Sequence, residues 1–161
     1  MFLKNYTSDV PVSDSIRRIE QVLIQCGVTA IQKEYGPTGK VAAITFRVTE
    51  NGRHHMIRLP SDEEAATDAL WRNYMGDDLL PDGKIKWSCR KKLKKKDFEK
   101  QGERTAWRIA KDWIEIEMSR IQLGQGEVMQ VFLSYAWNDQ LKQTFYHGLK
   151  DKGFLALKDA T

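Results

Sequence analysis

The amino-acid sequence predicts an α+β fold, in which a helix packs on a three- to four-stranded antiparallel sheet and a mainly helical half with one long helix follows. Three observations lead to this prediction: an amphipathic helical pattern near the start, three strand-like runs separated by turn signals, and a long helical pattern over residues 97–122. The chain has 161 residues, of which 41% are hydrophobic and 30% are charged. That length and composition suffice for a core that needs neither a metal nor a disulfide.

One compact domain is expected, made of three consecutive parts. Residues 1–80 form the layer of helix and sheet, residues 81–96 form a basic loop or an edge strand, and residues 97–161 form a helical part that packs on the first. The sequence contains neither an internal repeat nor a low-complexity linker apart from the basic segment.

The first predicted helix covers residues 14–26. Pro11 precedes it, Ser13 is a good N-cap, and Gly27 is a typical stop signal. The apolar side chains recur at helical spacing and so share one face, which carries Ile16, Ile19, Val22, Leu23 and Cys26. This face is expected to cover the apolar side of the sheet.

Three strands are predicted after this helix. The run VTAIQKEY ends at a turn over residues 36–39, and KVAAITFRVT follows with alternating apolar residues. Asn51 and Gly52 form a strong hairpin signal, after which RHHMIRL returns with the same alternation. The three runs therefore predict an antiparallel meander.

The remaining helices are predicted from capping and spacing. Ser61 and Glu64 form an S-x-x-E capping box for a second helix. The helix over residues 97–122 is apolar on two sides, so it is either enclosed in the core or packed against a partner chain. Helical spacing continues over residues 128–137, and a short terminal helix is expected over residues 140–152.

The sequence carries no targeting or membrane signal. It lacks a stretch of about 18 apolar residues, and the opening MFLKNYTSDVPVSDS lacks the apolar core of a signal peptide. We therefore expect a cytoplasmic protein that does not bind a membrane. Cys26 and Cys89 are expected to be reduced in that compartment, with Cys26 as a small core residue.

The segment KIKWSCRKKLKKK, residues 84–96, is the densest charge cluster in the chain. Eight of its thirteen residues are Lys or Arg and none is acidic. The whole chain has a net charge of only +4, so the rest of it is net negative. A local basic patch on a mildly acidic body steers a polyanion to one place.

This basic segment predicts a nucleic-acid interface. Lys and Arg neutralise phosphates and release counterions without reading sequence, and a tryptophan can stack on an unpaired base. Arg17 and Arg18 are possible additions to the surface, and the competing interpretation is a solvated loop that keeps the protein in solution. The predicted contact residues are Lys84, Lys86, Trp87, Arg90, Lys91, Lys92, Lys94, Lys95 and Lys96, extended by Arg53 and Arg58.

No metal site, cofactor site or catalytic centre is predicted. His54 and His55 are adjacent on a strand and point to opposite faces, which prevents chelation of one metal ion. Asp112 and Glu115 share a helical face, but they lack the lysine-bearing strand arrangement of a nuclease. The chain contains neither a P-loop nor a G-x-G-x-x-G or G-x-S-x-G motif. We therefore expect no enzymatic activity.

Two tryptophans, Trp107 and Trp137, are predicted to lie at a protein interface, because exposed tryptophan is enriched at interfaces. The competing interpretation places the aromatic stripe that contains them in the core. If one side of the long helix stays uncovered within the chain, the protein forms a homodimer.

Two stretches carry a resemblance to other proteins. The first comprises LKNYTSDVPV, IEQVL, TAIQKEYGPTGKVAAITF and IRLP, and the second comprises ERTAWRIAKDWIEIEMSRIQLGQGEVMQVFLSYAW followed by FYHGLKDKGFLAL. In these stretches, which cover most of the chain, the sequence resembles an uncharacterised family of small proteins carried by bacteriophages and other mobile elements. The patterns RTAWRIAKDW and EVMQVFLSYA are the more specific ones. The resemblance implies a cytoplasmic protein with a role in the life of a mobile element, and it supplies no catalytic residues.

The sequence thus predicts a non-enzymatic nucleic-acid-binding accessory protein of a phage or mobile element, acting in the host cytoplasm. Single-stranded DNA or RNA is favoured over duplex, because Trp87 can stack only on an unpaired base. The alternative is a protein-binding inhibitor or adaptor that acts on a host defence complex of the CRISPR type or on a replication complex. A metal-dependent nuclease is a third hypothesis.

Overall fold

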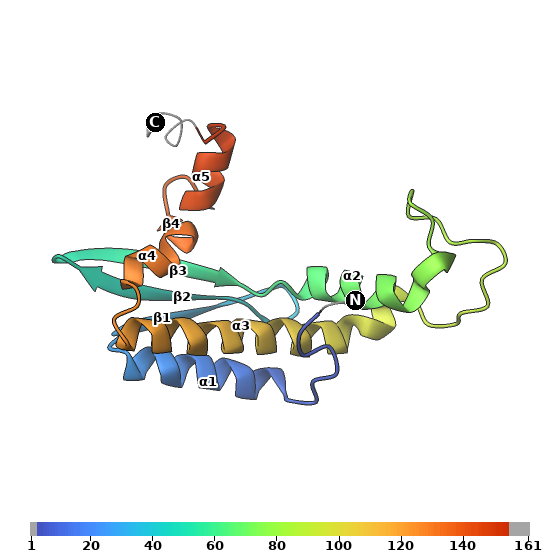
Figure 1. Ribbon diagram of the computed structural model, residues 1–161, viewed down its shortest axis with the longest axis horizontal. Helices are drawn as coiled ribbons and strands as arrows, with labels where there is room; N and C mark the ends of the chain where they lie inside the picture. Colours follow the sequence, from blue (N-terminus) through green and yellow to red (C-terminus); the bar gives the residue numbers. More distant parts are fainter. Residues whose placement is uncertain (1–2, 155–161) are drawn as a thin grey trace. The chain divides into compact units, whose positions relative to one another are not determined.

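The computed structural model describes residues 3–154 and shows an α+β fold (Figure 1). Within this range β1, β2 and β3 form an antiparallel sheet in that order, and β4 and β5 form a two-stranded sheet. The helices are α1 (Val12–Gln25), α2 (Glu63–Met75), α3 (Glu99–Gln122), α4 (Val128–Phe132) and α5 (Phe145–Asp151). The strands are β1 (Ala30–Tyr35), β2 (Val41–Glu50), β3 (Arg53–Pro60), β4 (Trp137–Asn138) and β5 (Gln143–Thr144). The predicted fold class, with one long helix, is confirmed. Each helix of the described range is too short or too polar to cross a membrane.

The chain divides into two compact units, each assembled from separate segments of the sequence. Unit 1 contains the chain up to Ile19 and the segment Ser61–Trp113, and unit 2 contains Glu20–Pro60 and the chain from Ile114 onward. Both α1 and α3 contribute residues to each unit. Each unit thus combines two segments that are separated in the sequence.

The three-stranded sheet of unit 2 is centred on β2. Its register places Ile44 opposite Leu59 and Phe46 opposite Ile57 on β3, and all four side chains are buried. Phe132 of α4 packs edge-on against Phe46, with the ring centres 5.4 Å apart. Paired apolar side chains on neighbouring strands stabilise a sheet and fix its register, as the alternating pattern predicts.

The turn between β2 and β3 confirms the predicted hairpin. Asn51 has φ of 50° and Gly52 has φ of 74°, so both lie in the left-handed region. A two-residue type I′ turn requires positive φ at both positions, and its twist matches that of the flanking strands.

The second helix does not begin with the predicted capping box. Its N-cap is Asp62, whose side chain forms no cap hydrogen bond, and α2 starts at Glu63. The carbonyl of Ser61 accepts from the Glu63 N–H at 2.6 Å. The Glu63 carboxylate is used in the core of unit 1, where it accepts from the indole N–H of Trp107 at 2.8 Å. The prediction of a Ser61–Glu64 capping box is therefore wrong.

The C-terminal part of unit 2 is less helical than predicted. After α4 the chain forms a 3₁₀ turn, η3 (Leu133–Tyr135), and then the strand β4. Ala136 bridges to Ile57 of the main sheet, and Trp137 pairs with Thr144 of β5. The helix expected over residues 128–137 is present as α4 and η3 up to Tyr135, and backbone pairing with strands takes over from Ala136. The last helix, α5, starts at Phe145 rather than near residue 140, because the β4–β5 hairpin occupies the intervening residues.

Unit 1 contains a cluster of charged and polar groups around Asp112 of α3. Its carboxylate accepts from Lys111 at 2.6 Å, from Lys4 at 2.8 Å and from Asn5 at 3.0 Å, with Arg108 at 3.8 Å. Desolvation by itself would raise the pKa of Asp112, but the hydrogen bonds from Lys111, Lys4 and Asn5 outweigh it and hold that pKa well below its ordinary value. The cluster ties the N-terminal segment to α3.

We expect Asp112→Asn to lower the free energy of unfolding at pH 7 by about 1–3 kcal/mol, because charge-assisted hydrogen bonds are lost. The folded pKa lies below the unfolded one, so the carboxylate stabilises the protein above its ordinary pKa of 3.8. This contribution is lost as the pH falls from there through the folded pKa. The gap between wild type and variant in urea unfolding should therefore narrow at low pH.

The matched control is Asp139→Asn, because Asp139 is exposed and pairs with Lys142 only three residues away at 2.6 Å. Exposed pairs of this kind contribute little, so this substitution should leave the unfolding free energy nearly unchanged. An Asp112→Asn deficit of the same size at pH 7 and at pH 3 would contradict the electrostatic explanation.

Candidate nucleic-acid interface

The basic segment lies in a loop of unit 1 that links the 3₁₀ turn η1 (Gly76–Asp78) to the 3₁₀ turn η2 (Lys95–Phe98). The residues between these turns form no helix and no strand, apart from a single bridge between Leu79 and Ile85. Residues 81–94 therefore form a loop, one of the two predicted forms, rather than an edge strand, and Lys95 and Lys96 begin η2. We call residues 79–94 the basic loop.

Two lysines of the segment anchor it to α2 and to the turn that follows α2. The ammonium of Lys91 donates to the Met75 carbonyl and to Asp78 at 2.8 Å, and it lies 5.8 Å from the centre of the Tyr74 ring. Lys95 pairs with Asp68 at 3.0 Å. A backbone bond from the Lys86 N–H to the Asp78 carbonyl, at 2.9 Å, adds a third attachment.

The anchoring pairs also shift the pKa values of Asp78, Lys91 and Asp68. The hydrogen bond between Asp78 and Lys91 lowers the pKa of Asp78 and raises that of Lys91. Hydrogen bonds from Arg72 and Lys95 lower the pKa of Asp68. These groups are thus charged in the folded protein, and Lys91 and Lys95 are committed to holding the loop.

Five other basic residues of the segment are exposed and form no ion pair with any residue between 3 and 154. We call them the unpaired cations. Lys84 is an intermediate case, since it pairs with Asp82 at 3.1 Å but its side chain remains 80% exposed. The unpaired cations are Lys86, Arg90, Lys92, Lys94 and Lys96.

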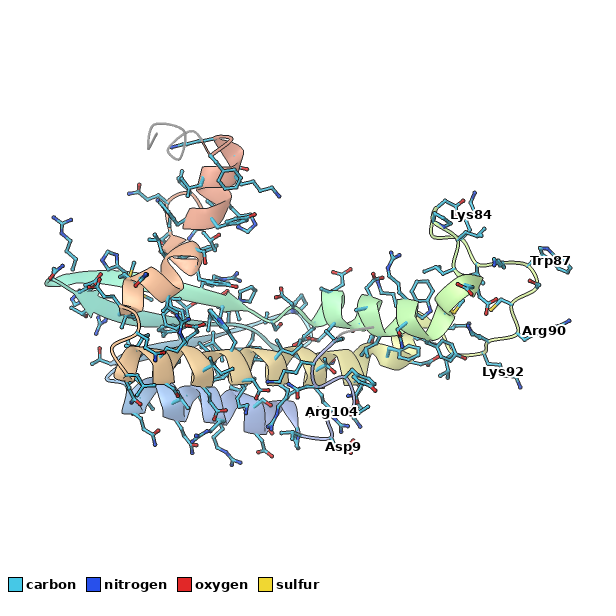
Figure 2. All side chains as sticks on the ribbon, viewed as in Figure 1. Asp9, Lys84, Trp87, Arg90, Lys92 and Arg104 are labelled. Atoms are coloured by element: carbon cyan, nitrogen blue, oxygen red, sulfur yellow. The ribbon has the colours of Figure 1, made fainter. Side chains whose placement is uncertain are left out.

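Trp87 is 98% exposed and lies among these cations. Figure 2 shows its side chain at the outer part of the loop, with Lys84, Arg90 and Lys92 also pointing away from the backbone. A tryptophan is among the largest apolar side chains, and leaving one in water forfeits the free energy of burying it. Basic side chains around an exposed aromatic ring form the arrangement that binds single-stranded nucleic acid in other proteins.

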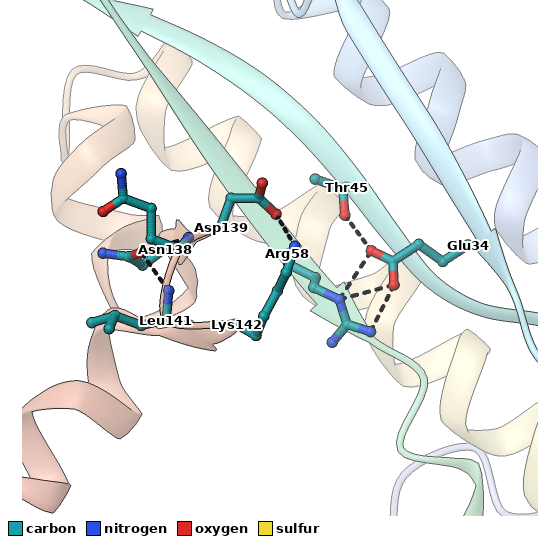
Figure 3. Close-up of polar contacts among 8 residues, drawn as sticks. Glu34, Thr45, Arg58, Asn138, Asp139, Leu141 and Lys142 are labelled. Carbon is teal, nitrogen blue, oxygen red and sulfur yellow. Dashed lines mark hydrogen bonds and ion pairs between the residues drawn. The ribbon is translucent and has the colours of Figure 1, made fainter.

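Arg58, a predicted contact residue, is paired within unit 2. It lies on β3 in unit 2, where its guanidinium donates to Glu34 through Nε at 3.0 Å and Nη2 at 2.8 Å (Figure 3). The hydroxyl of Thr45 donates to the same carboxylate at 2.9 Å, and Arg58 stacks over Trp137 at 4.9 Å. Glu34 thus fills the Nε–Nη2 edge of Arg58, and the contact of Arg58 with a phosphate stays a prediction.

Two further predicted cations lie on β3 and α1. Arg53 is exposed at the start of β3 in unit 2, and its participation stays a prediction. Arg17 pairs with Asp14 at 2.7 Å on α1.

Trp107 does not lie at a protein interface. It is 1% exposed in unit 1 and is hydrogen-bonded to Glu63, so the prediction of an exposed anchor there is wrong. Trp137 is half-buried and contacts Arg58 within unit 2. Trp107 is therefore a core residue, as the competing interpretation of the aromatic stripe proposed.

The histidines and carboxylates considered as metal ligands or catalytic groups do not cluster in the described part of the chain. In the described part of the chain, no three His, Cys, Asp or Glu side chains gather closely enough to hold a metal ion. His54 bonds to the Thr49 hydroxyl at 2.9 Å on the exposed side of the hairpin. Asp112 is surrounded by Lys4, Lys111 and Arg108 rather than by other carboxylates.

Comparison of the whole chain with protein-family models, with curated proteins and with solved structures finds no match.

Proposed function

We propose that this protein binds single-stranded nucleic acid through the basic loop without reading its sequence. The observation that carries the proposal is that one exposed segment holds Trp87 and the five unpaired cations together. Each cation can neutralise a phosphate and release condensed counterions, which supplies affinity that is independent of base identity.

The tryptophan decides between single strand and duplex. Its face is available to solvent over almost its whole area, and a base can stack on it only if that base is unpaired. Duplex bases are already stacked on one another, so a duplex gains the phosphate contacts alone. The same stacking serves DNA and RNA, because every base offers a π-face.

The anchoring lysines support this function by fixing the C-terminal part of the loop to η1 and α2. Lys91 and Lys95 hold it to Asp78 and Asp68, so less conformational entropy is lost when a ligand binds. The cations with no partner are those that remain available for phosphates. Some basic residues of the segment thus hold the loop and others are free to bind a ligand, which favours a binding surface over a merely solvated loop.

The test compares fluorescently labelled single-stranded DNA, single-stranded RNA and duplex DNA of equal length, each titrated at two salt concentrations. We expect micromolar or tighter binding to the single strands, weaker binding to duplex, and weakening of all three at higher salt. Absence of binding to every ligand would contradict the proposal. One series of titrations contains a divalent metal ion, and its control contains EDTA. Cleavage of the labelled oligonucleotide only in the presence of the metal would support the nuclease hypothesis instead.

The Trp87→Ala variant tests the stacking contribution. It should weaken single-strand binding by about 1–3 kcal/mol and leave duplex binding almost unchanged. Trp87→Phe should retain most of the affinity, because an aromatic face remains. Stability should not change, since the side chain is 98% exposed. An equal loss on single strand and duplex, measured by anisotropy, would assign Trp87 to another role.

A role as an accessory protein of a phage or other mobile element fits this proposal and rests on the resemblance of the sequence alone. The second candidate function is that of an inhibitor or adaptor that binds a host protein complex. The observation that favours it is the exposure of apolar side chains in unit 2, namely Leu141 at 63%, Phe145 at 44% and Tyr146 at 45%. If the affinity for nucleic acid is unchanged when these three residues are substituted, the nucleic-acid site is the basic loop and not this apolar surface.

A further inference from the structure

A groove lies between α5 and the β4–β5 hairpin in unit 2, and its volume is about 350 Å³. The residues of α5 and its C-cap that line the groove are Phe145, Gly148, Leu149 and Lys152. They follow one another at helical spacing, so they share one face of the helix. Leu141, in the loop between β4 and β5, lines the groove as well.

The apolar walls of the groove are open to solvent. Leu141 is 63% exposed and Phe145 is 44% exposed. A pocket for a free small molecule encloses most of the surface of that molecule. Walls as exposed as these instead suit a partner that buries them as it docks, because exposed apolar side chains in a cluster mark interaction sites. The groove therefore fits a segment of a partner protein.

Both sides of the groove are held in place by local hydrogen bonds. The side-chain carbonyl of Asn138 accepts from the N–H groups of Gln140 and Leu141, each at 3.0 Å, which fixes the loop (Figure 3). The hydroxyl of Thr144 accepts from the N–H of His147 at 3.4 Å and caps the start of α5. Because these bonds exist without a partner, less conformational entropy is lost when a partner binds.

Two polar side chains of the groove have no partner among residues 3–154. The amide nitrogen of Gln143 lies 3.4 Å from the place of a Cβ on Gly148, so this side chain points toward α5. Its amide forms no hydrogen bond with a described residue, and it offers the donor and the acceptor that a peptide group requires. Lys152 is the one charged residue among the described lining residues, and it forms no ion pair with any of them. The groove thus complements a peptide that carries a carboxylate.

We propose that this groove binds an acidic peptide segment of a partner protein. A bulky apolar side chain of the segment lies against Leu141, Phe145 and Leu149, and a neighbouring carboxylate pairs with Lys152. The inference does not rest on nucleic-acid binding by the basic loop. It specifies the chemistry of a partner for the second candidate function.

The test selects peptides from a library of randomised short sequences on the immobilised full-length protein, after depletion of the library on the Gly148→Leu variant. The added side chain starts beside Gln143 and fills the groove, while Lys152 is kept. The basic loop is the same in both proteins, so peptides that bind this loop are removed by the depletion. The selected peptides should carry a large apolar residue within a few positions of an aspartate or a glutamate.

Fluorescence anisotropy of one selected, labelled peptide then separates the contributions. Gly148→Leu should lower the affinity at least about tenfold, because the apolar contacts are lost. Lys152→Glu should lower it at least about fivefold. The matched control is Lys150→Glu, which changes the net charge equally at an exposed residue that does not line the groove, and its effect should be smaller. Each variant should keep the amide spectrum of a folded protein.

If Gly148→Leu proves unfolded, Leu141→Ala takes its place in the depletion, because it removes an exposed wall of the groove. The proposal is overturned if no peptide prefers the wild type, if the selected peptides lack an acidic residue, or if Lys152→Glu and Lys150→Glu have equal effects. Phenylacetate that displaces the peptide at concentrations as low as the peptide itself requires would make the groove a small-molecule site and would also overturn it. None of these results bears on nucleic-acid binding by the basic loop.

Discussion

Replacing Gly102 with alanine is expected to lower the free energy of unfolding by about 3 kcal/mol. A Cβ at this position would lie 2.0 Å from Oγ1 of Thr67 and 2.9 Å from both its Cα and its N. The hydroxyl can rotate away, but the backbone atoms of α2 cannot move without separating the two helices. The gain in helix propensity from glycine to alanine is about 1 kcal/mol and does not offset this clash.

The control for this substitution is Gly148→Ala on α5. The nearest atom there is Nε2 of Gln143, 3.4 Å from the added Cβ, and it is the end of a flexible side chain. That variant should be neutral or slightly stabilised in urea unfolding. Adding Thr67→Ala to Gly102→Ala should recover only part of the loss, because the contacts with the Thr67 backbone remain. A Gly102→Ala protein as stable as wild type would contradict the close packing of α2 and α3 in unit 1.

Changing the five unpaired cations to glutamine is expected to lower the affinity for single-stranded DNA on the order of a hundredfold or more at low salt. Lys86, Arg90, Lys92, Lys94 and Lys96 form no ion pair with a described residue, so the variant loses phosphate contacts and little folded-state stabilisation. The free energy of unfolding should therefore stay close to that of wild type. This pairing of lost binding with kept stability separates a binding surface from a structural one.

Charge-matched variants sharpen the comparison. Lys92→Gln with Lys94→Gln should weaken binding, whereas Lys150→Gln with Lys152→Gln, two exposed lysines at the end of α5, should not. Both pairs lower the net charge equally, so a general loss of positive charge would affect them alike. If both double substitutions lower the affinity for single-stranded DNA equally, the basic loop is not the specific binding site.

Much of the fold followed from local signals in the sequence. The Asn51–Gly52 turn and the alternation along β2 and β3 act over a few residues, and the structure has both. The β4–β5 hairpin could not be predicted in this way, because it depends on pairing of Ala136 with Ile57, far away in the sequence. The predicted capping of α2 was wrong because the helix begins one residue later than expected, with Asp62 rather than Ser61 at the N-cap.

The candidate site was predictable as a segment but not residue by residue. Charge density identifies the basic segment, yet it treats all eight of its cations alike. Lys91 and Lys95 are anchors because Asp78 and Asp68 lie within reach in the fold. The acids between Asp68 and Asp82 were the available signal, but the sequence does not say which lysine each one meets. The pairing of Arg58 with Glu34 was missed for the same reason, because the two residues lie on different strands.

The central claim is that the unpaired cations neutralise phosphates of a single strand. Its most direct test is the salt dependence of anisotropy-measured affinity for a labelled oligothymidylate, in wild type and in the five-site glutamine variant. A plot of log affinity against log salt concentration should have a slope near −3 to −4 for wild type, from about −0.7 per phosphate, and a slope near zero for the variant. Equal slopes for the two proteins would contradict the claim and place the phosphate contacts outside the unpaired cations.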